Sequence, residues 1–243
     1  MALDVTGRDV TGDPGQDADL DVLGMASVLF GDRLPLAQRY AEFLVSEGVR
    51  RGLIGPHEAP RIWSRHLLNC VVVAQLIPSG SSVTDIGSGA GLPGIVLAVA
   101  RPDLSVTLVE SLARRTTFLT EAVDGLGLTE VQVLRGRAEE CVATLPPADI
   151  VTARAVAPLD RLAQWSLPLA VVGGRMLAVK GAAAASEIAE CRDFIRRIGG
   201  GEPTVHECDG GVLPAPVTVV EVVREQQKTP VGSRRTGRDR GRR

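Results

Sequence analysis

The stretch TDIGSGAGLPGI, residues 84–95, decides the fold that this sequence predicts. It joins a β-branched run, SVTDI at 82–86, to an apolar helical segment, GIVLAVA at 94–100. Glycines between a strand and a helix let the backbone turn tightly and approach a ligand without a Cβ in the way. In an open α/β sheet such a loop lies beyond the carboxyl ends of the strands, where ligands bind. The stretch therefore predicts an α/β fold with a ligand site at this loop.

The same glycines fit two ligand-binding patterns. Residues 89–94 match G-x-G-x-x-G, the dinucleotide fingerprint, while 85–91 match the first motif of S-adenosylmethionine (SAM) enzymes. A carboxylate at Asp85 would repel a pyrophosphate but attract the methionine ammonium of SAM. Glu110, at the end of the next strand, suits the ribose of either ligand, and no second nucleotide-binding half follows. Asp85 thus favours SAM over a nicotinamide dinucleotide and over a purely structural glycine turn.

Strand and helix patterns alternate after residue 79, which predicts a parallel sheet with helices on both faces. Ser111 is expected to cap the second helix, and the last two strands, with no helix between them, to form an antiparallel hairpin. The expected strands are 82–86, 105–110, 130–136, 148–155, 174–181, 203–208 and 217–223, and the expected helices are 94–100, 111–128, 138–145, 158–170 and 186–198. The predicted fold class is α/β: a mostly parallel, Rossmann-like sheet of the class I SAM-dependent methyltransferases with an antiparallel C-terminal strand.

The chain is predicted to have four parts. A helical region at 23–78 precedes the SAM-binding methyltransferase domain at 79–227. The head, 1–22, holds six Asp and one Arg, a net charge of −5, and the tail, 228–243, holds six Arg, one Lys and one Asp, a net charge of +6. Both ends are poor in large apolar residues, so we expect disorder there. The tail either neutralises RNA phosphates or is a solvated appendage.

Several classes of protein are excluded by composition. No run of 18 apolar residues exists and the N-terminus is acidic, which argues against a membrane span or a secretory signal. The cysteines form no C-x-x-C pair and the histidines do not cluster with them, so we expect neither a metal site nor disulfides. Reduced thiols indicate a cytoplasmic protein. The four cysteines are Cys70, Cys141, Cys191 and Cys208.

Several motifs resemble one known family. DIGSGAGLPGI, VESLARRTTFL, GRAEE, TARAVAPL and GRMLAVKG occur in the order and spacing of the bacterial 16S ribosomal RNA guanine-N7 methyltransferases, first called glucose-inhibited division protein B. RHLLN at 65–69 extends the similarity, which runs from about residue 36 to 225. The resemblance implies transfer of a methyl group from SAM to guanine N7 in the 530 loop, helix 18, of 16S rRNA, by a monomer that acts on the small ribosomal subunit. In this family, loss of that methyl group is linked to streptomycin resistance.

The resemblance also assigns roles to individual residues. Three of these residues also have a purely structural interpretation: Ala138 as part of helix packing, Arg137 as a surface charge, and His66 as a residue of the core. Asn69 stands where the family commonly has Asp, and its upstream Asn-Leu-Thr motif is absent. The implied cofactor-binding residues are Asp85, Gly87, Gly89, Gly91, Leu92, Glu110, Ala138, Glu139 and Arg154. The implied catalytic residues are Arg154 and Lys180, the implied RNA-binding residues are Arg65, His66, Arg137 and Lys180, and no metal ligand is implied.

The motifs that are missing narrow the chemistry. Enzymes that methylate exocyclic amines often carry Asn/Asp-Pro-Pro-Tyr/Phe after the fourth strand, where this chain has ARAVAPL at 153–159. Cytosine C5 enzymes need a cysteine nucleophile, and none has the expected setting here. Guanine N7 needs neither proton removal nor covalent attack, although hydroxyl and carboxylate acceptors pass the same test. A small-molecule methyltransferase and a non-catalytic SAM-binding RNA module therefore remain as alternatives.

Overall fold

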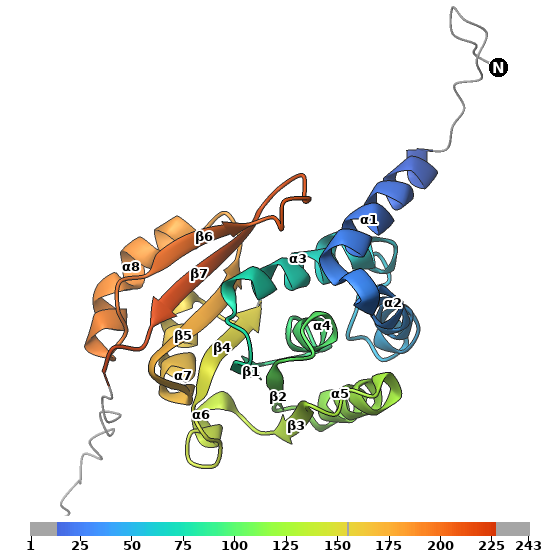
Figure 1. Ribbon diagram of the computed structural model, residues 1–243. Helices are drawn as coiled ribbons and strands as arrows, with labels where there is room; N and C mark the ends of the chain where they lie inside the picture. Colours follow the sequence, from blue (N-terminus) through green and yellow to red (C-terminus); the bar gives the residue numbers. More distant parts are fainter. Residues whose placement is uncertain (1–13, 155, 227–243) are drawn as a thin grey trace, which may run out of the picture.

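The computed structural model describes residues 14–154 and 156–226, which form one seven-stranded sheet in the order β3-β2-β1-β4-β5-β7-β6 (Figure 1). Strands β1 to β5 are parallel to one another, whereas β7 is antiparallel to both β5 and β6. The predicted fold class and the predicted C-terminal hairpin are therefore confirmed. The strands are β1 (Ser82–Ile86), β2 (Ser105–Glu110), β3 (Val131–Arg135), β4 (Ala148–Arg154), β5 (Ala170–Lys180), β6 (Thr204–Cys208) and β7 (Val217–Val223).

The strand order reverses between β1 and β4. The chain builds β2 and β3 on one side of β1 and then returns to add β4 on the other side, with Asp85 opposite Thr152 in register. The loops that follow β1 and β4 consequently leave the same edge of the sheet side by side. In doubly wound sheets this reversal point is where ligands bind.

Helices cover both faces of the sheet because its strands are apolar on both sides. On β1, Val83 belongs to the core under α4, α5 and the N-terminal helices, whereas Ile86 belongs to the core under α7 and α8. Helix α4 has no exposed face, since six of its seven residues are buried. These helices are α4 (Gly94–Ala100), α5 (Ala113–Leu126), α6 (Ala138–Cys141), α7 (Leu159–Ser166) and α8 (Ala184–Arg197).

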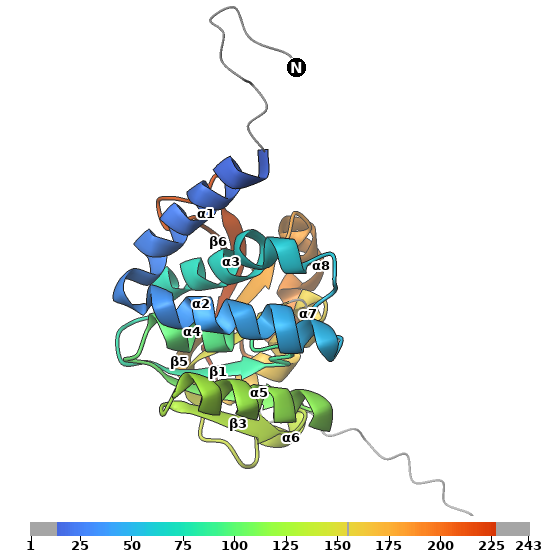
Figure 2. The ribbon, with the colours of Figure 1, turned by 90° about the vertical axis from the view of Figure 1, so that its right-hand side faces the viewer.

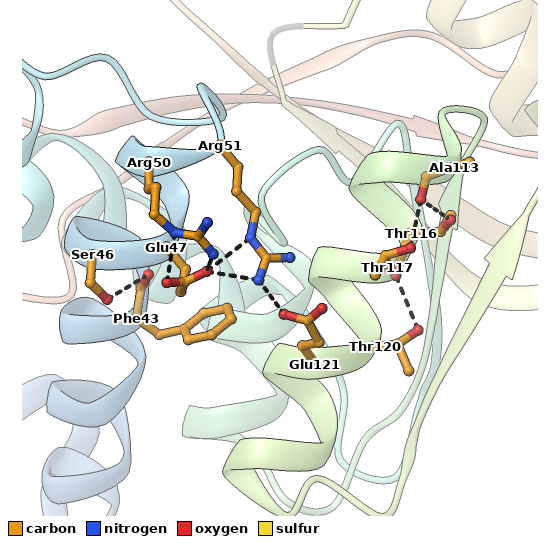
Figure 3. A network of polar contacts seen from close by, with 10 residues as sticks. All are labelled: Phe43, Ser46, Glu47, Arg50, Arg51, Ala113, Thr116, Thr117, Thr120 and Glu121. Carbon is orange, nitrogen blue, oxygen red and sulfur yellow. Dashed lines mark hydrogen bonds and ion pairs between the residues drawn. The ribbon is translucent and has the colours of Figure 1, made fainter.

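The N-terminal helices lie over α4 and α5 (Figure 2). Arg51 joins them to α5, because its guanidinium is ion-paired with Glu47 at 2.7 Å and also with Glu121 (Figure 3). The same guanidinium lies over the ring of Phe118. The N-terminal helices thus form an outer layer over α4 and α5, which we call the N-terminal wall. Its elements are α1 (Pro14–Phe30), η1 (Gly31–Arg33), α2 (Leu34–Phe43), the π-helical η2 (Leu44–Gly48), η3 (Ala59–Arg61), the π-helical η4 (Ile62–Leu67), α3 (Leu68–Val71) and η5 (Val72–Leu76), and η6 (Leu167–Leu169) follows α7.

Two local predictions differ from the structure. Ser111 is not the cap of α5: Leu112 holds that position, and the Ser111 hydroxyl instead donates to Glu110 Oε1 at 3.4 Å. Helix α1 starts at Pro14, inside the segment 1–22 for which disorder was expected. Proline suits the first helical position and acidic residues favour a helix N-terminus, and both occur at 14–21. The rest of that head and the tail 228–243 lie outside the described residues. Among the described residues, no helix has the length and apolar character to cross a bilayer.

Candidate active site

The loop after β1 is held in a conformation that requires glycine. Gly87, Gly89 and Gly91 all have positive φ, at +66°, +59° and +92°. A Cβ on Gly87 would lie 2.9 Å from Val156, and one on Gly91 would lie 2.6 Å from the hydroxyl oxygen of Tyr40. Gly87 and Gly89 therefore present bare backbone at the end of the sheet, where a ligand can approach closely, whereas Gly91 is buried against Tyr40 and Ile95.

A pocket of about 230 Å³ opens beside this loop. It contains Gly87 together with three of the residues predicted at the cofactor or the RNA, Arg137, Ala138 and Glu139. Its floor is mostly apolar, which suits a flat heteroaromatic ring such as adenine. Leu92 does not line it and packs against the core instead. The lining residues are Ile86, Gly87, Val109, Ser111, Gly136, Arg137, Ala138, Glu139, Val156 and Trp165.

Glu110 ends β2 next to this pocket and fastens the glycine loop. Its side chain is buried; Oε2 accepts the Gly89 N–H at 3.1 Å and Oε1 accepts the Leu112 N–H at 2.9 Å. Arg115 lies 3.5 Å from Oε2. The Ser111 hydroxyl also donates to Oε1, so each carboxylate oxygen already has two neighbouring donors within the protein. The carboxylate thus fastens the loop, and its contact with ribose stays a prediction.

Asp85 lies beneath the loop, fully buried. Its Oδ2 accepts the Gly94 N–H at 3.1 Å, while Oδ1 has no hydrogen-bond partner among the described residues. Burial raises the pKa of this carboxyl group to about 7. A buried carboxylate oxygen without a partner is costly unless positive charge lies nearby. SAM carries such charge on its sulfonium and ammonium groups, so the loop, the pocket and Asp85 fit this cofactor.

Arg154, at the end of β4, donates hydrogen bonds from its guanidinium to residues of the N-terminal region. Nη1 donates to Cys70 Sγ at 3.0 Å, and Nη2 donates to the Arg65 carbonyl and to His66 Nδ1, both at 3.0 Å. Because arginine can only donate, His66 Nδ1 must be the acceptor and its Nε2 carries the proton, which it donates to Glu58 at 3.1 Å. Burial, and then the charge of Arg154, lower the pKa of His66.

The ring of His66, predicted to bind RNA, thus has a protein partner at both nitrogens. Cys70 and Glu58 were not singled out for this site by sequence reasoning. No motif signals them, because each acts through a contact made in space. The side chain of Arg65 is largely exposed and lies 3.6 Å from Glu58.

A second cavity, of about 960 Å³, lies between the N-terminal helices, the ends of β4 and β5, and the segment before β7. Lys180, predicted to be catalytic, lines it at the end of β5. The Lys180 Nζ is 2.6 Å from Glu187 Oε2 and donates to the Ala157 carbonyl at 3.1 Å. We call this second cavity the groove. The residues that line the groove are Val22, Met25, Ser64, Leu68, Asn69, Arg154, Val179, Lys180, Gly181, Ala182, Glu187, Leu213, Pro214, Ala215, Pro216, Val217 and Thr218.

The structure separates the predicted RNA-binding residues. Arg137 lines the cofactor pocket and Lys180 lines the groove. Arg65 and His66 lie on the N-terminal wall, where both accept hydrogen bonds from Arg154. Glu187 was not predicted, although it lies in the groove. Among the described residues no group of three or more His, Cys, Asp or Glu side chains is arranged to hold a metal ion.

Two solved structures with similar folds have names that describe methyltransferases. A predicted O-methyltransferase, Atu636 from Agrobacterium tumefaciens, gives a TM-score of 0.51 at 19% identity, covering 65% of this chain and 81% of that one. The precorrin-6y C5,15-methyltransferase from Geobacter metallireducens gives 0.50 at 15% identity, covering 71% and 90%. At these identities the similarity shows the fold alone, and it is the predicted one.

Sequence relatives are far more similar. The ribosomal RNA small subunit methyltransferase G of Salinispora tropica is 62% identical over 222 residues, which cover 89% of this chain and 92% of that protein. Its counterpart in Mycobacterium sp. (strain KMS) is 52% identical over 216 residues, covering 88% and 94%. The family model for rRNA small subunit methyltransferase G matches residues 33–211. With a model match and relatives that extend over most of its length, this chain belongs to the rRNA small subunit methyltransferase G family.

Proposed function

We propose that this protein transfers the methyl group of SAM to N7 of a guanine in the 530 loop, helix 18, of 16S rRNA. Family membership makes the chain an rRNA methyltransferase that uses SAM, as the sequence predicts. The finer proposal is the position of the base, its presentation on the small ribosomal subunit, and a monomeric enzyme in the bacterial cytoplasm. The resemblance in the motifs supports it, and so does the geometry of the two cavities.

One observation carries the proposal: the linings of both cavities include a residue at or just after the end of β4. Val156 lines the cofactor pocket, whereas Arg154, two residues earlier, lines the groove. A donor in the pocket and an acceptor in the groove therefore approach the same short segment. Holding two reactants in line is worth as much as about 7–11 kcal/mol of a barrier, which supports catalysis by positioning.

The groove offers little for acid–base chemistry. When bound, SAM supplies a methyl carbon that its sulfonium already activates. Among the described residues that line the groove, Glu187 is the one carboxylate, and it is paired with Lys180; no cysteine or histidine is among them. An acceptor with a free lone pair, such as guanine N7, needs no base from the protein.

The residues of the site then have distinct tasks. Gly87 and Gly89 bring backbone to the cofactor, Glu110 fastens their loop, and Arg154 joins the loop's edge of the sheet to the N-terminal wall. Lys180 is paired with Glu187 and donates to the Ala157 carbonyl, and its third N–H is left to donate to an acceptor of the RNA. In this scheme Arg154 positions the wall of the groove, and Lys180 touches the RNA.

The test is methyl transfer from labelled SAM to small ribosomal subunits from a strain that lacks the gene. We expect label in helix 18 and, after reduction and aniline treatment, strand scission at one guanine, the signature of 7-methylguanine. Label confined to small metabolites would favour the alternative of a small-molecule enzyme. RNA binding without any transfer would favour a non-catalytic module. Naked 16S rRNA, tested in parallel, distinguishes the RNA from the assembled particle as the substrate.

A further inference from the structure

Glu187 is a carboxylate of the groove to which the proposed function assigns no role. It lies in the first turn of α8, on the far side of the sheet from the N-terminal helices, and its side chain reaches the groove. Oε2 accepts the Leu159 N–H at 2.8 Å and is 2.6 Å from Lys180 Nζ. These contacts fix the orientation of the carboxylate, which is one quarter exposed at 26%.

Each member of this pair keeps one unused hydrogen-bonding group. Among residues 14–154 and 156–226, nothing bonds to Glu187 Oε1. The Lys180 ammonium has three donors, and two of them are directed to Glu187 and to the Ala157 carbonyl. The groove therefore offers an acceptor and a donor side by side, on side chains whose positions are already set by the protein.

This pattern is complementary to the Watson–Crick edge of guanine. That edge presents an O6 acceptor next to the N1–H and N2–H donors, so O6 faces the lysine and the two donors face the carboxylate. Adenine presents an N1 lone pair at the same place, and a carboxylate opposite a lone pair has no proton to accept. A site built around a buried polar partner rejects a base that lacks it.

The walls of the groove suit a base removed from its helix. Leu68, Val179, Leu213 and Pro216 give apolar surface for the faces of a ring. RNA-binding proteins read unpaired bases on their Watson–Crick edges while apolar or aromatic groups cover the ring faces. Val179 is also paired in register with Arg154, so the ends of β4 and β5 together form this wall of the groove.

We propose that Glu187, oriented by Lys180 and the Leu159 N–H, is the residue that selects guanine. Its Oε1 accepts from N1–H and N2–H of the target base, and the third N–H of Lys180 donates to O6. N7 lies on the opposite edge of the purine and is left free to meet the methyl donor. This inference rests on the proposed function, and its test distinguishes the two.

The experiment compares guanine with inosine, which keeps O6, N1–H and N7 but lacks the N2 amino group. Small subunits are reconstituted with 16S rRNA carrying either base at the target position, and single-turnover methyl transfer from labelled SAM is measured. We expect the wild-type protein to methylate inosine at least about tenfold more slowly, the loss of a hydrogen bond to a charged group. We expect Glu187→Gln to be at least about tenfold slower on guanine and to treat both bases nearly alike.

Glu190→Gln is the matched control, because Glu190 lies exposed on the same helix and outside the groove. It should keep the wild-type rate and the wild-type preference. Comparing preferences rather than rates cancels the difference in N7 reactivity between the bases. The inference is overturned if Glu187→Gln keeps the wild-type preference, or if the wild-type protein shows none, a result that needs no variant. If the wild-type protein transfers nothing to guanine N7, the proposed function itself fails.

Discussion

Arg154 donates a hydrogen bond from Nη2 to Nδ1 of His66 at 3.0 Å, across 88 residues of sequence. The bond joins the end of β4 to the π-helical segment η4, and so connects the methyltransferase sheet with the N-terminal wall. Because residues of both the sheet and the N-terminal wall line the groove, this contact sets the shape of the groove. It also fixes His66 as the neutral tautomer that donates to Glu58.

Replacing Arg154 by lysine should break the hydrogen bonds between β4 and the N-terminal wall while keeping the positive charge. Lysine has no planar fork and cannot reach the Arg65 carbonyl, His66 and Cys70 together. We expect a loss of about 1–3 kcal/mol of folding stability and a methyl-transfer rate reduced at least about tenfold. Urea unfolding and single-turnover kinetics measure the two effects. Unchanged kinetics in a destabilised variant would leave Arg154 a purely structural residue.

The stability of the protein should depend on His66 at mildly acidic pH. Burial and the charge of Arg154 lower its pKa in the folded state below the usual 6.5, so below pH 6.5 the unfolded chain binds a proton more readily. The contribution of neutral His66 is therefore complete above pH 6.5 and is lost as the pH falls through the folded pKa. Unfolding free energies measured from pH 7.5 to 5 should decline more steeply for the wild-type protein than for His66→Gln. Parallel curves would contradict this linkage.

Asp85 should produce the opposite dependence. Burial raises its folded pKa to about 7 from 3.8, so between those values the folded protein holds a proton that the unfolded chain has released. The corresponding stability is present below pH 3.8 and is lost as the pH rises through about 7, a change of about 4 kcal/mol. In Asp85→Asn, measured without SAM, this dependence should disappear. If the variant and the wild-type protein have the same pH profile, Asp85 is not buried as described.

Gly89 tests the cofactor loop through its backbone. A Cβ there meets only the Gly87 carbonyl, at 3.7 Å, so Gly89→Val acts through strain at φ +59° rather than through a clash. We expect SAM affinity, measured by calorimetry, to fall at least about 100-fold. Gly127→Val is the matched control, since Gly127 has φ +67° and open space but ends α5 away from the loop. Equal SAM affinity in the two variants would argue against a cofactor role for this loop.

The basic tail should contribute to RNA binding through charge alone. Residues 228–243 carry a net charge of +6, and each phosphate neutralised adds about 0.7–0.9 to the salt dependence of binding. Deleting them should weaken RNA affinity and reduce the slope of log affinity against log salt, with SAM affinity unchanged. A deletion that leaves the slope unaltered would make the tail a solvated appendage.

The prediction from sequence was strongest where the signal is local. The alternation after residue 79 predicted the strands along the chain, their mostly parallel arrangement and the antiparallel C-terminal hairpin, and the glycine spacing predicted the ligand loop. It failed at Ser111, because a nearby carboxylate, Glu110, takes its hydroxyl. It also began the fifth strand at 174, four residues after β5 begins at Ala170. Gly173 and Gly174 interrupt the β-branched pattern there without ending the strand.

The candidate site was predicted only in part. The glycines stand out because they follow the end of a strand, which a parallel sheet brings to the ligand edge, whereas Ala138 was implied by the family resemblance alone. Glu187 has no such mark: it sits in a helix among alanines and becomes part of the groove because α8 packs beside α7 and its carboxylate reaches Lys180 at the end of β5. Cys70 likewise acquires its role from Arg154, 84 residues away, and Glu58 from His66, whose other ring nitrogen Arg154 contacts.

The sequence by itself determined the layered α/β fold, the glycine loop after β1 and the family. Periodicity and turn chemistry act between neighbouring residues and are written along the chain. Only the tertiary structure decided that Asp85 lies under the loop, that Arg154 holds the N-terminal wall, and that Glu187 faces the groove. Burial and ion pairing depend on which layers meet, and that follows from packing the whole chain rather than from any one segment.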